Sequence, residues 1–168
     1  STSAQSSQTA CLAGTYNPNV GSSSSTACLG ADPGYHVPSS AQSSQTDCLA
    51  GTYQPLTGQS SCNDADPGYY VPTSAQSSQT ACLAGTFNPN VGSSSSTACL
   101  DAGPGYYVPI SAQTSQSACL AGTYQPLTGQ SSCNDADPGY YVPTSAQSSQ
   151  TASDPGYHVP TSAQSSQT

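Results

Sequence analysis

A fifteen-residue segment recurs almost unchanged along this chain. DPGYYVPTSAQSSQT occupies residues 66–80 and 137–151, and residues 154–168 repeat it with His158 in place of Tyr. The motif CLAGT, followed by an aromatic residue, opens at Cys11, Cys48, Cys82 and Cys119, so the longer period is 71 residues (82 − 11 and 119 − 48). Both segments align as forms of one smaller unit of about 14 to 20 residues. A unit this small cannot bury a face alone and must pack against its neighbours, as in a solenoid.

The composition does not allow a conventional hydrophobic core. Leu, Val, Ile and Phe number 17 of 168 residues, and there is no Trp or Met. Pro18, Pro38 and their counterparts end each β-favouring run after a few residues, so only very short strands fit. The Ser/Gln segments show no apolar stripe at helical spacing. We predict a small disulfide-rich, mostly irregular β protein: an elongated tandem-repeat rod with very short hairpins, no helix and no single globular core.

The motif positions divide the chain into repeats. Residues 1–10 are a partial repeat, residues 11–47, 48–81, 82–118 and 119–152 are repeats one to four, and residues 153–168 are a truncated repeat without its Cys pair. Both ends of the sequence fall within a repeat. We therefore expect the chain to be part of a longer repetitive polypeptide.

The charge pattern excludes several classes of partner. The chain has no Lys and no Arg, and its acidic residues give a net charge of −8. Binding to nucleic acid and to anionic membrane surfaces depends on basic side chains. No apolar run approaches the roughly 20 residues of a membrane-spanning helix. We expect no nucleic-acid partner and no membrane insertion in this segment.

The cysteines indicate disulfides formed outside the cytosol. The chain has eight Cys and no C-x-x-C motif, which favours an extracellular or cell-surface location. After Thr151 both cysteines of an expected AGTY unit are missing together, which suggests that such cysteines are partners. This predicts the pairs Cys11–Cys28, Cys48–Cys62, Cys82–Cys99 and Cys119–Cys133. The alternative is a ladder of Cys28–Cys48, Cys62–Cys82 and Cys99–Cys119, with the outer cysteines bonded to neighbouring segments.

The unit resembles a known family. Its order of Cys, Ala-Gly-Thr-Tyr, a turn, then Gly, a Ser pair and Cys is similar to the ephrin-receptor-like and TNF-receptor-like cysteine-rich repeats of extracellular proteins. The resemblance covers Cys11 to Thr151. That family commonly places a C-x-x-C pair at each junction, where this chain has a single Cys, so the bridge pattern of the family does not transfer. The resemblance implies a ligand-binding ectodomain as an alternative function.

Hydroxyl side chains are abundant. Ser and Thr total 51 residues and cluster beside Pro and in the run Ser22–Ser25, a composition associated with O-glycosylated stalks. No N-x-S/T sequon occurs, so any glycan is O-linked. The alternative is that Ser and Gln are simply solvated linker residues. The O-glycan candidates are Ser22, Ser23, Ser24, Ser25, Ser39, Thr73, Ser74, Thr144, Ser145, Thr161 and Ser162.

No residue pattern predicts catalysis or a cofactor. His36 and His158 are the only histidines, and other repeats carry Tyr at that place, so neither is a strong metal or catalytic candidate. Nucleophile and phosphate-loop motifs are absent. Some acidic residues are weak calcium candidates, although Asp-Pro-Gly is more often a turn than a calcium loop. These residues are Asp64, Asp66, Asp135 and Asp137.

The repetition itself favours a structural function. We expect a structural component of an extracellular fibre or surface appendage, O-glycosylated, whose partners are copies of itself and its own glycans, and not an enzyme. The alternative is a multivalent adhesin or receptor-like ectodomain. Near-identical units weigh against a single specific binding site.

Overall fold

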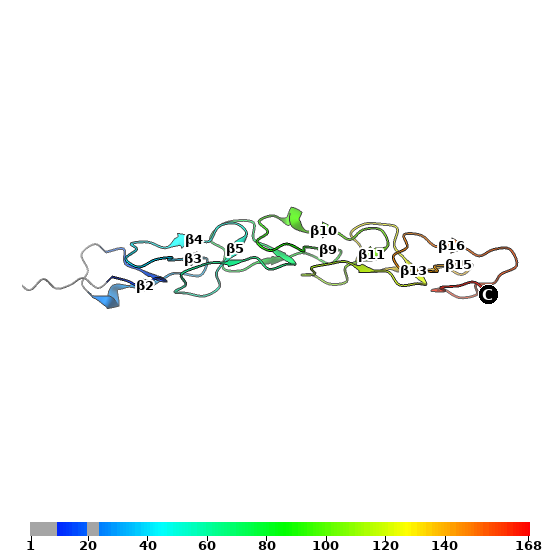
Figure 1. Cartoon of the computed structure of the whole chain (residues 1–168), viewed down its shortest axis with the longest axis horizontal. Coiled ribbons are helices and arrows are strands. Elements are labelled where there is room, and N and C mark those ends of the chain that lie inside the picture. The colour runs from blue at the N-terminus through cyan, green and yellow to red at the C-terminus, as the bar shows by residue number, and fades with distance from the viewer. Residues whose placement is uncertain (1–9, 20–23) are drawn as a thin grey trace, which may run out of the picture. The chain divides into compact units, whose positions relative to one another are not determined.

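The computed structural model describes residues 10–19 and 24–168 (Figure 1). The chain divides into two compact units. The first comprises the described residues up to Asp66 with Tyr70–Thr80 and Val91–Ser95, and the second comprises Pro67–Tyr69, Ala81–Asn90 and Ser96–Thr168. The described residues form no α-helix. They form two-residue strands in antiparallel pairs, two single-turn 3-10 helices and one isolated parallel bridge between Phe87 and Gln113. The predicted class, small, disulfide-rich and mostly irregular β with very short hairpins, is confirmed.

All the strand pairs connect neighbouring segments of the chain. The pairs are β1 (Thr15–Tyr16) with β2 (Leu29–Gly30), β3 (Tyr35–His36) with β4 (Thr46–Asp47), β5 (Thr52–Tyr53) with β6 (Asn63–Asp64), β7 (Tyr69–Tyr70) with β8 (Thr80–Ala81), β9 (Thr86–Phe87) with β10 (Leu100–Asp101), β11 (Tyr106–Tyr107) with β12 (Ser117–Ala118), β13 (Thr123–Tyr124) with β14 (Asn134–Asp135), and β15 (Tyr140–Tyr141) with β16 (Thr151–Ala152). The 3-10 helices are η1 (Ser25–Ala27) and η2 (Ser96–Ala98).

Two different sequences open the hairpins with the same tight turn. In LAGT, the backbone N–H of Thr52 donates to the carbonyl oxygen of Leu49 at 2.9 Å; in DPGY, the N–H of Tyr35 donates to Asp32 at 3.0 Å. The third turn residue is glycine in both, with φ of 90° at Gly51 and 89° at Gly34. A type II turn needs positive φ at this place and accepts Pro before it. CLAGT and DPGY therefore encode the same structural element.

Backbone hydrogen bonds join each hairpin to the next. In the first unit, Gly51 N–H donates to Val71 O at 2.8 Å, Gln54 N–H to Gln76 O at 3.1 Å, and Ala75 N–H to Cys48 O at 2.8 Å. The equivalent bonds of the second unit are Gly122 to Val142 at 2.9 Å, Gln125 to Gln147 at 3.1 Å, and Ala146 to Cys119 at 2.8 Å. We call this set of three bonds the junction. It satisfies backbone groups that strands of two residues leave unpaired.

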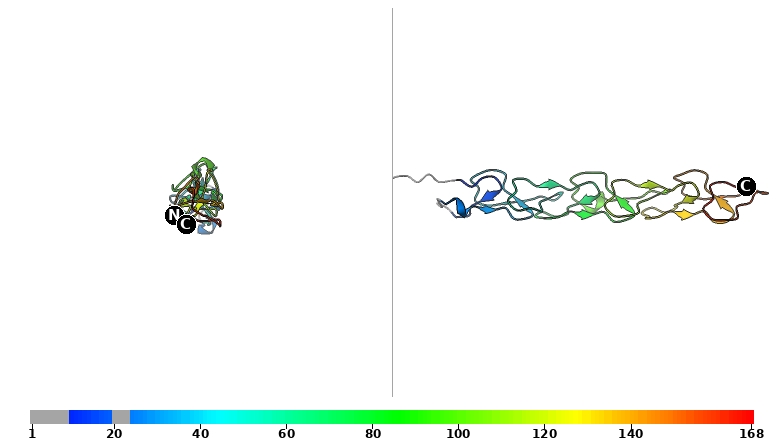
Figure 2. Two further views of the ribbon diagram at one scale, coloured as in Figure 1. Left: turned by 90° about the vertical axis from the view of Figure 1, so that its right-hand side faces the viewer. Right: turned by 90° about the horizontal axis from the view of Figure 1, so that it is seen from below.

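The junction also forms where a cysteine-bearing hairpin is missing. After Ser153 the sequence passes directly to a second DPGY segment, which has no assigned strand but closes as a hairpin through the paired backbone bonds of His158 N–H to Thr168 O at 2.8 Å and Thr168 N–H to His158 O at 3.3 Å. Gly139 N–H donates to Val159 O, Val142 N–H to Gln164 O, and Ala163 N–H to Ala136 O, each at 2.9 Å. Figure 2 shows the hairpins of the second unit following one another, green to red. A hairpin without cysteines can therefore occupy a place taken elsewhere by a disulfide hairpin.

Buried side chains are distributed evenly over the hairpins. A buried Cys or Ala lies three residues before each turn glycine except Gly156, where Ser153 is half-buried, and Val, Asn or Gln lies three residues after it; Val37, Val71, Val108 and Val142 are fully buried. Gln54 is 3% exposed, but its Nε2 donates to Ser61 O at 2.7 Å and its Oε1 accepts from Leu56 N–H at 3.1 Å. Such pairing removes the cost of burying an amide. As predicted, the described residues share no single globular core.

Candidate functional site

Each disulfide closes the loop of one LAGT hairpin. The bridges are Cys11–Cys28, Cys48–Cys62, Cys82–Cys99 and Cys119–Cys133, with Cα–Cα distances from 5.6 to 5.8 Å. These are the pairs inferred from the missing cysteine pair, and the alternative ladder is not formed. The chain is thus a cysteine-rich tandem repeat, and its four disulfides are typical of an extracellular or secreted protein.

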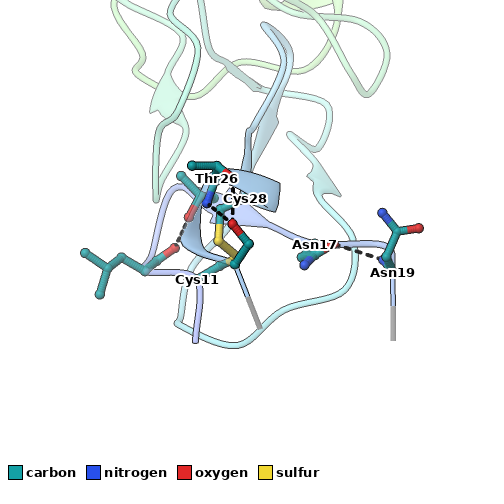
Figure 3. Close-up of a disulfide and its surroundings, with 8 residues drawn as sticks. Cys11, Asn17, Asn19, Thr26 and Cys28 are labelled. Atoms are coloured by element: carbon teal, nitrogen blue, oxygen red, sulfur yellow. Dashed lines mark hydrogen bonds between the residues drawn. A yellow bond between two sulfur atoms is a disulfide. The ribbon is translucent and has the colours of Figure 1, made fainter. Parts of the chain in front are cut away.

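The longer disulfide loops contain hydrogen-bonded polar side chains (Figure 3). Around Cys11–Cys28, the Oγ of Ser24 lies 2.6 Å from the Oγ1 of Thr26 and accepts from the Thr26 N–H at 3.3 Å. In the same loop, the N–H of Asn19 donates to the Oδ1 of Asn17 at 3.0 Å. The turns of these loops are therefore held by short polar side chains.

A shallow hollow lies beside each of the shorter disulfide loops. The hollow at Cys48–Cys62 is lined by His36, Pro38, Asp47, Leu49, Thr52 and Cys62, among others. The equivalent hollow at Cys119–Cys133 is lined by Tyr107, Leu120, Thr123, Ser132 and Cys133. The two disulfide loops have the same sequence, CLAGTYQPLTGQSSC. Their hollows therefore differ through the preceding hairpin, which supplies His36 and Asp47 to the first hollow and Tyr107 to the second.

The structure brings His36 next to a disulfide. Its Nδ1 lies 3.2 Å from the Sγ of Cys62, and the nitrogen and the sulfurs of Cys48 and Cys62 all lie within 4.8 Å of one another. Within the described ranges, this is the one group of three His, Cys, Asp or Glu side chains close enough to share a metal ion. The sequence alone gives no reason to expect a role for His36, because Tyr occupies its place in other repeats. His36 and Cys62 belong to successive hairpins, so their contact is seen only in the structure.

The weak calcium candidates have two different environments. The Oδ2 of Asp66 accepts from Gln79 Nε2 at 2.7 Å, and the Oε1 of Gln79 accepts from the Asp66 N–H at 2.7 Å. Asp137 and Gln150 form the same two bonds. Asp64 and Asp135 lie in β6 and β14 and pair with Thr52 and Thr123. The described residues do not gather these carboxylates into a group of three ligands.

Most of the O-glycan candidates are exposed. Some threonine hydroxyls also serve as acceptors; Thr73 Oγ1, for example, accepts from Gln76 Nε2 at 3.1 Å. Ser22 and Ser23 lie outside the described residues, and only the backbone of Ser25 is described. The exposed candidates are Ser24, Ser39, Thr73, Ser74, Thr144, Ser145, Thr161 and Ser162.

A leucine projects into solvent from the same position of every disulfide hairpin. Leu12, Leu49, Leu83 and Leu120 each follow the first cysteine and are between 71% and 75% exposed. A single exposed leucine is ordinary. Here an exposed leucine recurs at the same position of each repeat, so the four form a set of equivalent apolar side chains.

Comparisons with known proteins leave the family open. No protein-family model matches the chain, and no curated protein matches it either. The resemblance to the receptor-type cysteine-rich repeats remains a prediction. In the part of the chain that the structure describes, no helix has the length and apolar character needed to cross a bilayer.

Proposed function

We propose that this chain is a structural segment of an extracellular fibre or cell-surface appendage. The proposal assigns it no enzymatic activity and no cofactor. The junction carries the proposal, because the same three backbone hydrogen bonds recur between successive hairpins within each unit. Apart from the turn glycine, backbone bonds of this kind do not require a particular side chain. Hairpins that each bond to the next one through the same backbone groups can be added without changing the others, which suits an elongated rod.

Copies of the chain are its proposed partners. The exposed leucines at the CLAGT position, which we call the leucine set (Leu12, Leu49, Leu83 and Leu120), supply one apolar side chain from each disulfide hairpin. The net charge of −8 opposes association because every copy repels every other. Salt screens this repulsion and leaves apolar contacts intact. Association should therefore strengthen as ionic strength rises.

Sedimentation and electron microscopy test self-association. We expect the full chain to form large assemblies that grow with protein and salt concentration, and to appear as filaments. Replacing the leucine set by serine should leave monomers. Leu56→Ser with Leu127→Ser is the matched control, because these side chains are each 61% exposed but lie at another position. A chain that stays monomeric and binds one soluble partner would instead support the adhesin or receptor-like alternative.

The glycan part of the proposal has its own test. The exposed hydroxyls beside Pro, such as Thr73 and Thr144, are the proposed sites of O-linked sugars. The chain has no Lys or Arg for trypsin, so native material is digested with Asp-N without reduction. Peptides heavier than their sequence by hexose or pentose steps would support the glycan coat. Peptides of bare polypeptide mass would contradict the glycan coat. Contacts between protein chains would then have to hold the fibre together.

A further inference from the structure

The group formed by His36, Cys48 and Cys62 has the composition of a metal site. Zinc takes Cys sulfur at about 2.3 Å and His nitrogen at about 2.0–2.1 Å, so its ligand atoms lie roughly 3.5–4 Å apart. The three ligand atoms here lie within 4.8 Å of one another while the two sulfurs are still bonded. The His36 ring already points its Nδ1 at Cys62. Small side-chain movements would therefore suffice once the disulfide opens.

The surroundings of the group also suit a cation. His36 and Cys62 line the hollow, so an ion can arrive from solvent although Cys48 is fully buried. Asp47 lines the same hollow and adds negative charge. No Lys or Arg anywhere in the chain opposes a cation. A fourth coordination position would face the hollow and take water.

We propose that His36, Cys48 and Cys62 form a redox-gated site for a zinc-type divalent cation, closed while the disulfide is intact. The reductant is a small thiol. One thiolate attacks the Sγ of Cys62, and the S–S electron pair leaves on Cys48. A second thiolate then releases Cys62, so that two small thiols become one disulfide and two cysteine thiols form. Zinc replaces both thiol protons, which pass to the buffer, and His36 donates its nitrogen lone pair.

The chain carries its own control for this site. Cys119 and Cys133 lie in an identical loop, but by sequence and strand register Tyr107 and Ala118 occupy the positions of His36 and Asp47. Asp-N separates the two pairs, since Cys48 and Cys62 fall in peptide 47–63 whereas Cys119 and Cys133 fall in peptide 101–134. Both pairs can therefore be compared in one sample.

The test is protection from alkylation. The full chain is reduced with a water-soluble phosphine, which becomes the phosphine oxide, and then receives one equivalent of zinc before iodoacetamide. We expect zinc to slow alkylation of Cys48 and Cys62 by on the order of tenfold or more relative to Cys119 and Cys133. This is the order of the loss in metal affinity when one residue that supports a metal site is removed. Equal protection of both pairs, or protection of neither, would overturn the proposal.

Two reciprocal variants test whether His36 is responsible for the protection of Cys48 and Cys62 by zinc. His36→Tyr should remove the extra protection of Cys48 and Cys62. Tyr107→His with Ala118→Asp should create protection at Cys119 and Cys133, and both residues are ones that the repeat already accommodates at this place. Unchanged protection in His36→Tyr, or no gain in the double variant, would show that His36 is not a ligand.

Discussion

The carbonyl oxygen of Ala163 lies against the α-carbon of Gly122, a glycine two hairpins earlier in the second unit. A Cβ on Gly122 would overlap that oxygen, and its φ is 90°. In the first unit Gly51 has the same relationship to the carbonyl group of Gly92, which a Cβ would meet at 2.5 Å. Gly139 has φ of 87° but nothing within 4 Å of its Cβ position. The turn requires glycine at all three places, and close packing requires it at two.

Gly122→Ala should therefore destabilise the protein more than Gly139→Ala. Both variants bear the strain of a left-handed alanine, about 1–2 kcal/mol, and Gly122→Ala adds an overlap with backbone worth about 1–3 kcal/mol. Calorimetric unfolding of the two variants measures the difference. Equal losses of stability in the two variants would mean that the backbone at Ala163 moves away from the new Cβ at no free-energy cost.

Ala75→Gly should stabilise the chain modestly. Ala75 has φ of 58°, and Gly58 holds the equivalent corner with φ of 69°. Relief of left-handed strain exceeds the added backbone entropy of glycine by about 0.5–1 kcal/mol. Gly58→Ala should cost a similar amount. Nothing lies within 4 Å of its Cβ position, so only the left-handed strain acts on the new alanine. Denaturant midpoints test both, and a stabilising Gly58→Ala would contradict the argument.

Replacing Cys48 and Cys62 together by alanine should cost about 3 kcal/mol, the chain-entropy value for a loop of about 15 residues. Ala31 and Ala65 occupy the equivalent buried position in the neighbouring hairpins. Alanine in place of Cys48 should therefore leave little cavity. Thermal unfolding followed by tyrosine absorbance measures the loss. The Cys119 and Cys133 double variant is the control, and a large difference between the two would show that the hairpins are not equivalent.

Gln79→Ala should cost more than Gln116→Ala. Gln79 makes two hydrogen bonds with Asp66, whereas the Oε1 of Gln116 accepts one from the N–H of Gly103 at 2.7 Å. A bond to a charged group contributes about 1.5–3 kcal/mol and a neutral one about 1 kcal/mol. Hydrogen exchange at the Asp66 and Gly103 amides reports each site separately. The prediction fails if both amides gain exchange equally.

Local patterns in the sequence predicted the hairpins. Glycine after Ala or Pro marks the turn at Gly51 and Gly34, and Pro limits each strand. The missing cysteine pair after Thr151 pointed to bridges within a loop, and Cys48–Cys62 is such a bridge. Each of these signals acts over a few residues or is visible by comparing repeats.

Longer-range features left no such signal. The junction bond from Gly51 to Val71 uses only backbone atoms, which carry no residue-specific pattern. The Ser/Gln segments were interpreted as linkers or glycan carriers, yet Gln79 closes its hairpin through Asp66, thirteen residues earlier. His36 was set aside because Tyr replaces it elsewhere. Its contact with Cys62 depends on how one hairpin packs on the next.

The junction after Ala152, where a cysteine-free hairpin stands in place of a disulfide hairpin, has a consequence for how such a protein can evolve. If the near-identical repeats of this chain recombine out of register, the products gain or lose whole repeats. Since every hairpin offers the same backbone donors and acceptors, the products keep their joints whichever hairpin is lost. Natural variants of this protein should therefore differ in the number of whole repeats, with length the property that selection adjusts.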